Sequence, residues 1–313
     1  MEQVPCHDAD YDARVPRHFL TGEELTSEEL DRLLARAIEL KRDRLGSNVL
    51  AGRSVALIFD KPSTRTRLSF EVGVHELGGH PVLLREGEMQ ISRGESVRDT
   101  ALVLSRFVHA VGIRTGPHAV VEELAANAAV PVINMLTAEH HPCQALADLM
   151  TLRERFGELR GLRLVYVGDG NNVAHSLMLL GALAGMEVVV ATPEELRPDA
   201  RYASNGVTTT TDAAAAADGA DALYTDVWVS MSDDEAQAAS RRALLAPYRL
   251  DEALLSRAAD RAVVLHCLPA HPGEEITEGV LYGERSAVWD QAENRLHAQK
   301  ALLELLVGES RAG

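Results

Sequence analysis

The sequence is poor in cysteine and in aromatic residues, and it has no long apolar run. Its three cysteines, Cys6, Cys143 and Cys267, lie far apart, a spacing that fits neither a zinc site nor a disulfide framework. No stretch approaches the roughly 18 apolar residues of a membrane-spanning helix. The N-terminus is acidic where a signal peptide needs cations. We therefore expect a cytoplasmic protein that does not cross a membrane.

Positive charge is also scarce. The chain carries 31 Lys and Arg against 47 Asp and Glu, which gives a formal net charge of −16. Proteins that bind nucleic acid usually show a basic surplus or a basic stripe, because phosphate contacts dominate their affinity. The lack of any basic block argues against nucleic acid and anionic membranes as partners. It also makes a local group of arginines more informative.

Two catalytic motifs are missing as well. There is no G-x-x-x-x-G-K-[ST] loop, so nucleoside triphosphate chemistry is not favoured, and no G-x-S-x-G elbow for a nucleophilic serine. The segment 168–173 begins like a dinucleotide-binding turn, but Val173 replaces its third glycine and no acid follows the strand predicted at 187–191. NAD is therefore not expected, and we predict neither a cofactor nor a metal.

Short apolar runs with strand character alternate with segments of helical character along the whole chain. This alternation favours parallel sheets covered by helices on both faces. We predict an α/β fold of two doubly wound parallel-sheet domains joined by helices, at 1–150 and 151–291, with a C-terminal helix at 292–313 that packs back on the first domain. The expected strands are 54–59, 80–84, 110–114, 130–136, 163–167, 187–191, 207–210, 222–228, 262–268 and 287–290, and the expected helices include 96–108, 120–128, 142–156, 213–217 and 292–307.

A polar turn follows the first predicted strand and opens a helix. It reads Ser63-Thr64-Arg65-Thr66-Arg67 and supplies three hydroxyl and two guanidinium groups. A helix N-terminus offers unpaired N–H groups and a partial positive charge, and arginine suits bidentate contact with phosphate oxygens. The segment predicts a phosphate site, although a capped helix with solvated arginines would show the same residues.

Other polar groups follow the later strands, at the sheet edge where ligands bind. Arg114 ends one strand, and His141 could donate to a carbonyl oxygen, though a lone histidine is more often a cap or a core residue. The amide of Asn172 suits a carboxylate or an amino acid backbone. Asp226 lies in an apolar run, where an unpaired charge is costly, so it needs a cation from the protein or a substrate. Cys267 is either a nucleophile or inert packing.

Together these segments resemble the ornithine carbamoyltransferase family. The matching pieces occur in order from about residue 54 to 300, nearly the whole chain. They are Ser63–Arg67, Gln90, Arg114, His141–Gln144, Gly168–Asn172, Asp226–Met231, His266–Pro269 and Glu293–Arg295.

The resemblance implies a reaction and an assembly. Carbamoyl phosphate and L-ornithine would give L-citrulline and phosphate, in arginine metabolism or the urea cycle, without a cofactor or a covalent intermediate. The first domain would bind carbamoyl phosphate, and a second, Rossmann-like domain would bind ornithine and close on the first. The resemblance also implies a homotrimer with active sites at subunit interfaces.

Individual roles follow from the same resemblance. The expected catalytic residues are Arg65, Arg114, His141 and Cys267, the last as a positioning and electrostatic element. Ornithine is expected at Asn172, Asp226, Ser230 and Met231. Carbamoyl phosphate is expected at Ser63, Thr64, Arg65, Thr66, Gln90, Arg114, His141, Gln144, Cys267, Leu268 and Arg295, with Gln90 reaching from around the site or from a neighbouring subunit.

Two loops depart from the family pattern, and rival functions remain open. The departures are Ser232-Asp233 and His271-Pro272, which could affect closure or affinity. The nearest rivals are carbamoyltransferases for aspartate, putrescine or lysine, and a different class is a non-catalytic module that senses carbamoyl phosphate or an amino acid. Asn172 together with Asp226 favours an α-amino acid as substrate, and the full set of donors favours an enzyme.

Overall fold

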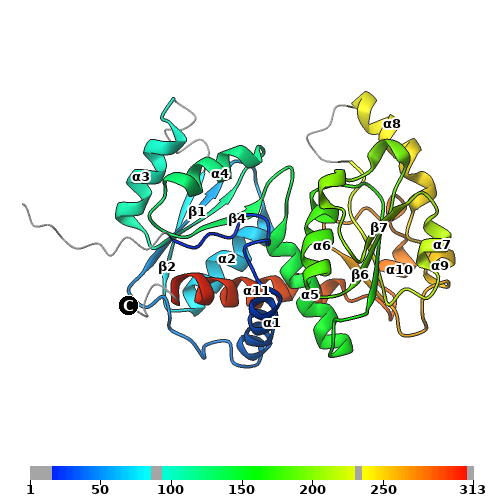
Figure 1. The fold of residues 1–313 in the computed structure, drawn as a ribbon, viewed down its shortest axis with the longest axis horizontal. Coiled ribbons are helices and arrows are strands. Elements are labelled where there is room, and N and C mark those ends of the chain that lie inside the picture. The colour runs from blue at the N-terminus through cyan, green and yellow to red at the C-terminus, as the bar shows by residue number, and fades with distance from the viewer. Residues whose placement is uncertain (1–15, 86–93, 230–234, 309–313) are drawn as a thin grey trace, which may run out of the picture.

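The computed structural model describes residues 16–85, 94–229 and 235–308. Two lobes, each built on a parallel sheet, lie on either side of a group of helices (Figure 1). Among the described residues, no helix is both long enough and apolar enough to cross a membrane.

The first sheet has four parallel strands in the order β2-β1-β3-β4. Residues of β1 alternate between its two faces, as expected for a strand buried on both sides. Val55 and Leu57 join the core on the α2 side, whereas Ala56 and Ile58 pack with the residues of α3 and α4. The elements are β1 (Ser54–Phe59), α2 (Thr64–Glu76), β2 (His80–Arg85), α3 (Val97–Phe107), β3 (Ala110–Arg114), α4 (His118–Asn127) and β4 (Val132–Leu136).

The second sheet has five parallel strands in the order β7-β6-β5-β8-β9. The order reverses beside β5, and in such sheets ligands bind at the carboxyl ends next to this reversal. Its strands are β5 (Arg163–Val167), β6 (Glu187–Ala191), β7 (Val207–Thr210), β8 (Ala222–Thr225) and β9 (Val263–His266). Its helices are α6 (Asn172–Leu183), α7 (Ala213–Ala217), α8 (Glu235–Leu245), α9 (Glu252–Leu255) and α10 (Glu278–Leu281), with 3₁₀ turns at Glu194–Leu196, Ala200–Tyr202 and Ala246–Tyr248.

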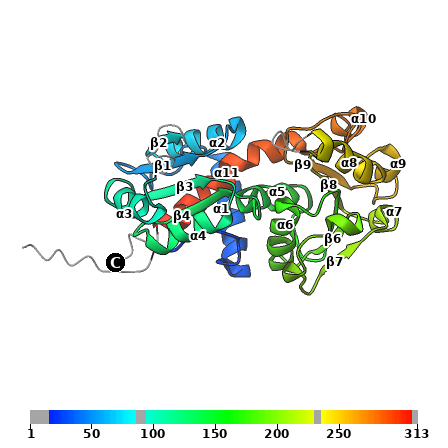
Figure 2. The same ribbon diagram turned by 90° about the horizontal axis from the view of Figure 1, so that it is seen from above.

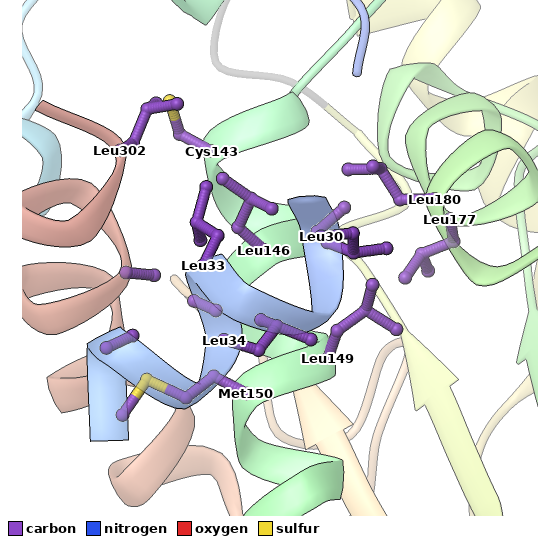
Figure 3. Close-up of a cluster of buried hydrophobic side chains, with 14 of the residues drawn as sticks. Leu30, Leu33, Leu34, Cys143, Leu146, Leu149, Met150, Leu177, Leu180 and Leu302 are labelled. Atoms are coloured by element: carbon purple, nitrogen blue, oxygen red, sulfur yellow. The ribbon is translucent and has the colours of Figure 1, made fainter. Parts of the chain in front are cut away.

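Three helices connect the lobes: α1 (Ser27–Arg42), α5 (Pro142–Phe156) and α11 (Val288–Gly308). The helix α11 packs against α1, α2 and α5 and also contacts β9, so it reaches from one lobe to the other (Figure 2). Leucines of α1, α5 and α6 interdigitate in one continuous apolar cluster that includes side chains of both sheets (Figure 3). Because this cluster is shared, the two lobes are held together by hydrophobic burial as well as by the chain.

Most predicted elements are confirmed, and five strands have the predicted bounds: β1, β3, β5, β6 and β7. The helices α5 and α7 also begin and end where the sequence predicts. The strands predicted at 222–228 and 262–268 are shorter than expected, since pairing stops at Thr225 and His266. The residues beyond those two ends turn away from the sheet and form part of the site described below.

The strand predicted at 287–290 is wrong. Ser286 forms only an isolated bridge with Val264, and the N–H of Ala287 donates to the Val264 carbonyl. The chain therefore follows β9 for two residues, and Val288 then begins α11. A short apolar run cannot by itself distinguish an edge strand from the first turn of a buried helix.

Candidate functional site

The phosphate turn opens α2 directly after β1. Ser63 is the N-cap residue, and its side chain makes no capping hydrogen bond, while Thr64 is exposed. Thr66 is buried, and its hydroxyl oxygen accepts from Arg295 Nη2 at 2.7 Å and from Arg114 Nη1 at 3.3 Å. The start of α2, the end of β3 and the middle of α11 thus meet at a single hydroxyl group.

Three guanidinium groups gather at this point, and no hydrogen bond or ion pair among the described residues joins any of them directly to a carboxylate. Burial, followed by repulsion from Arg295 and Arg65, lowers the pKa of Arg114 to about 10. Burial also lowers the pKa of Arg295. The Nε atoms of Arg114 and Arg295 are buried and have no partner within the described residues. Because burying unpaired donors and like charges is costly, the cluster is arranged to receive an anion.

His141 and Gln144 extend the cluster from the N-terminus of α5. Arg295 Nη1 donates to Gln144 Oε1 at 2.7 Å and lies 3.5 Å from His141 Nε2. Since arginine can only donate, the contact requires His141 to accept at Nε2 and to carry its proton at Nδ1. Burial, followed by repulsion from Arg295 and Arg114, lowers the pKa of His141 well below its usual value. A neutral imidazole with a buried, unpartnered Nδ1 is therefore available to donate to a ligand.

Sequence reasoning missed the carboxylate behind this cluster. Asp148 is fully buried on α5, where its Oδ1 accepts from Gln144 Nε2 at 2.8 Å and from Gln291 Nε2 at 2.7 Å. Burial raises the pKa of Asp148 to about 7. Gln291 in turn accepts from the backbone N–H of His266 at 2.8 Å. Side chains of α5 and α11 therefore connect the arginine cluster to the end of β9.

Asp226 lies beyond the end of β8 and is 7% exposed. Its carboxylate accepts from Asn171 Nδ2 at 2.8 Å, from Cys267 Sγ at 2.9 Å and from the N–H of Val227 at 2.8 Å. These donors are all neutral, and the described part of the chain places no Lys or Arg within ion-pair distance of Asp226. The carboxylate of Asp226 is thus held by neutral hydrogen-bond donors and has no counter-ion among the described residues.

Cys267 follows β9 and is half-buried. Burial and the neighbouring Asp226 carboxylate raise the pKa of its thiol well above the usual value. Because only a thiolate is a good nucleophile, Cys267 acts here as a hydrogen-bond donor and not as an attacking group.

Two neighbouring asparagines at the start of α6 make different contacts. Asn172, the expected ornithine ligand, donates from Nδ2 to the carbonyl of Thr137 at 2.6 Å and so joins the two lobes. Asn171 caps α6 and also donates to Asp226. The preceding Gly170 is required by packing, since a Cβ there would lie 2.4 Å from the carbonyl oxygen of Leu196. Asn171 therefore belongs to the candidate site.

The remaining predicted residues fall into two groups. Arg65 and Leu268 lie at the site, half-buried, and Leu268 has a left-handed backbone with φ of 60°. Gln90, Ser230 and Met231 lie outside the described residues.

Among the described residues, two groups of side chains have the composition of a metal site, but several of their ligand atoms already make hydrogen bonds or ion pairs. In the group of Asp226, His266 and Cys267, both ring nitrogens of His266 take part in hydrogen bonds. In the group of His271, Glu274 and Glu275, Glu274 pairs with Arg242 and Glu275 accepts from His266. An ion at either group would have to displace these contacts.

A histidine cluster lies between the lobes, next to the site. His140 contacts His118 and His175, with ring centroids 4.9 and 6.2 Å apart, and its Nε2 lies 3.0 Å from the Tyr202 hydroxyl. Burial lowers the pKa of His140 to about 3, with added repulsion from His118 and His175. A histidine in an unfolded chain has a pKa of about 6.5. Below that pH the unfolded chain therefore binds more protons at His140 than the folded protein does. Protonation of His140 therefore leaves the free energy of unfolding unchanged above about pH 6.5. It lowers that free energy as the pH falls from there toward 3.

We expect His140→Gln to be less stable than the parent protein at pH 7.5, because packing around the ring is lost. The difference should narrow at pH 5.5, because only the parent protein pays the cost of keeping this ring neutral. Urea unfolding at the two pH values measures both free energies. A difference that stays constant would show that His140 binds protons equally in the folded and unfolded states.

Comparison with known proteins agrees with the geometry of the site. Residues 17–154 match the carbamoyl-P binding domain of the aspartate/ornithine carbamoyltransferase family, and residues 160–306 match its Asp/Orn binding domain. An ornithine carbamoyltransferase from Parafrankia sp. (strain EAN1pec) is 55% identical over 311 residues, which cover 95% of this chain and 98% of that protein. One from Acidothermus cellulolyticus is 54% identical over 302 residues, which cover 93% and 96%.

Solved structures show the same likeness. The ornithine carbamoyltransferase from Pyrococcus furiosus superposes with a TM-score of 0.90 at 46% identity, covering 94% of this chain and 98% of that one. The enzyme from Thermus thermophilus gives a TM-score of 0.87 at 45% identity, covering 94% and 100%. The two matched domains together span both sheets and the arginine cluster. This chain belongs to the aspartate/ornithine carbamoyltransferase family.

Proposed function

We propose that this chain is an ornithine carbamoyltransferase, which transfers the carbamoyl group of carbamoyl phosphate to the δ-amine of L-ornithine. The observation that carries the proposal is the pairing of two charge-imbalanced sites. Arg65, Arg114 and Arg295 surround Thr66 with excess positive charge, and no described Lys or Arg forms an ion pair with Asp226. A phosphate fits the first site and an ammonium group fits the second.

The donors around Thr66 fit the charge that develops during the reaction. When an amine attacks the carbamoyl carbon, negative charge grows on the carbonyl oxygen and then passes to the leaving phosphate. The N–H groups of Arg65, Arg114 and the start of α2 are assigned to the phosphate, and the free Nδ1–H of His141 to the carbonyl oxygen. Donors fixed before the reaction stabilise the transition state more than the ground state.

Asp226 is assigned to the α-ammonium group of ornithine. Its own donors already hold the carboxylate in place, so the substrate meets a fixed acceptor. The thiol of Cys267 stays protonated and positions this carboxylate. The δ-amine must be neutral to attack, and we expect the rate to rise toward alkaline pH because free amines titrate in that range.

The substrate is tested by citrulline formation, with ornithine, putrescine, lysine and aspartate offered in parallel beside carbamoyl phosphate. Ornithine should be turned over fastest, because putrescine lacks the α-carboxylate assigned to Asn172 and aspartate would bring a second carboxylate toward Asp226. Faster turnover of another amine would refute the substrate assignment. Binding of carbamoyl phosphate without any turnover would favour the non-catalytic module.

The ornithine assignment entails a cellular role and an assembly, which we also propose. The reaction would place the protein in arginine metabolism, in the cytoplasm. The exposed apolar residues Leu102, Val103 and Phe107 on α3, the last 72% exposed, support a homotrimer, since a surface of this kind is typical of a buried interface. Residues 1–150 and the C-terminal helix would form the carbamoyl-phosphate domain, and 151–291 the ornithine domain.

A further inference from the structure

The loop that follows β9 contains a residue other than glycine with a left-handed backbone conformation. Leu268 adopts φ of 60°, a left-handed conformation that is unfavourable for a residue other than glycine. It follows Cys267, whose thiol holds Asp226. Such a conformation persists only where surrounding contacts enforce it. The contacts that hold Leu268 therefore also set the geometry of Cys267 at the site.

Two successive hydrogen bonds connect the backbone of this loop to His266 and then to Glu275. The N–H of Leu268 donates to Nδ1 of His266 at 2.9 Å, and His266 Nε2 lies 3.2 Å from Oε1 of Glu275. A backbone N–H can only donate, so Nδ1 must accept and the ring proton must lie on Nε2, where it donates to Glu275. The contact with Glu275 thus selects the one tautomer of His266 that can accept from Leu268.

Glu275 is completely buried and reaches the loop at both ends. Besides His266 at its start, the same Oε1 accepts from the backbone N–H of His271 at its end. Its Oε2 has no hydrogen-bond partner within the described residues, and only the ring of His271, 3.9 Å away, approaches it. Burying a carboxylate with one unpaired oxygen is unfavourable for folding. Its presence here is consistent with a role in fixing a loop geometry that apolar packing alone could not fix.

We propose that Glu275 and His266 are positioning residues for carbamoyl transfer: Glu275 fixes the tautomer of His266, and His266 holds the Leu268 N–H so that Cys267 and Leu268 face the reacting groups. Neither residue lies at the arginine cluster, and His266 is only 1% exposed. They act through the loop and not on a substrate. The proposal rests on the proposed function for its kinetic consequence, but the geometry can be tested without turnover.

Two substitutions of His266 separate the two hydrogen bonds of its ring. His266→Asn places an oxygen near the position of Nδ1, so it keeps an acceptor for Leu268 and loses the donor to Glu275. His266→Gln places its amide near Nε2, so it keeps a donor for Glu275 and loses the acceptor for Leu268. Glu274→Gln is the matched control for Glu275, since Glu274 pairs with Arg242 at the surface.

We expect His266→Gln to lower kcat about 10²-fold, because misplacing reacting groups by roughly 1 Å has an effect of this size. The KM for carbamoyl phosphate should change little, since the phosphate turn on α2 is untouched. His266→Asn should retain most of kcat. Glu275→Leu should lower kcat as His266→Gln does. Glu275→Gln should retain activity, because its amide oxygen can still accept from His266. Glu274→Gln should have the kcat and KM of the parent protein.

Hydrogen exchange followed by mass spectrometry tests the same proposal without substrate. The peptide containing Leu268 should lose protection in His266→Gln and keep it in His266→Asn, with equal melting temperatures showing that both variants are folded. If the two His266 variants lose protection and kcat equally, or if neither loses any, the proposal is overturned. If a His266 variant does not fold, the Glu275→Leu and Glu275→Gln pair decides by the same criteria. A parent protein that makes no citrulline would refute the proposed function, while the exchange result would still judge the hydrogen-bond chain.

Discussion

Replacing Arg65 with glutamine is expected to lower kcat/KM for carbamoyl phosphate about 10²- to 10³-fold, the usual effect of removing one donor from a developing anion. Arg65 lies at the start of α2 and makes no hydrogen bond or ion pair with any described residue, yet it repels Arg114 and Arg295. In the free protein the charge of Arg65 is therefore unfavourable. The substitution should leave the melting temperature of the free protein unchanged or slightly higher.

The neighbouring Arg67 provides the control. Its Nε donates to Glu71 at 2.9 Å on the same helix, an exposed pair of the kind that contributes little to stability. Arg67→Gln should thus keep nearly normal turnover. Steady-state kinetics and thermal unfolding of both variants separate the roles. If Arg65→Gln kept the parent activity, or if it destabilised the free protein strongly, the assignment of Arg65 to a phosphate would be wrong.

Asp226→Asn is expected to lower kcat/KM for ornithine by about 10²- to 10³-fold. Leaving a buried charge without its partner costs about 2–5 kcal/mol, and here the partner is the ammonium group of the substrate. The amide is nearly the same size as the carboxylate and can still accept from Asn171 or from Val227, so the fold should survive. The KM for carbamoyl phosphate should stay within about twofold, because the arginine cluster is built from other elements.

Asp218→Asn serves as the matched control, since Asp218 pairs with Arg257 on the exposed surface. It should leave both KM values unchanged. The two variants can be compared in one set of initial-rate measurements in which each substrate is varied in turn. An Asp226→Asn protein with a normal KM and kcat for ornithine would show that the ammonium group binds elsewhere.

The site is divided between two lobes, and a buried polar network joins its parts. Arg295 contacts Thr66 and Gln144, Gln144 and Gln291 share Asp148, and Gln291 holds the backbone of His266. Each link is a hydrogen bond between buried groups, so removing one member leaves others unsatisfied. This network would hold the proposed phosphate site on α2 and the proposed ammonium site beyond β8 in a fixed relative position.

Local sequence patterns predicted most of the strands because their period and their polar ends are local signals. The polar residues at the ends of β1, β3 and β4 could be expected to meet, since parallel strands deliver their carboxyl ends to one edge. The misassigned strand at 287–290 shows the limit of this reasoning. Its apolar residues are buried in either conformation, and only the pairing with Val264 and the start of α11 decide between them.

Residues that act through distant partners could not be predicted in this way. Asp148 sits within a helix and Glu275 within a loop, and neither follows a strand. Their roles come from hydrogen bonds with Gln291 and His266, which depend on tertiary packing. Asn171 was within reach of the sequence, because an asparagine that caps a helix with its side-chain oxygen still has an amide nitrogen free to donate.

A time course that measures citrulline and phosphate in the same reaction tests the account most directly. With carbamoyl phosphate and ornithine both present, we predict equal amounts of the two products at every time point, and no enzyme-dependent phosphate release when ornithine is omitted. Equality follows if the arginine cluster holds the leaving group while the amine beside Asp226 attacks. Phosphate that appears without citrulline would mean that water is the acceptor, and it would contradict carbamoyl transfer to ornithine.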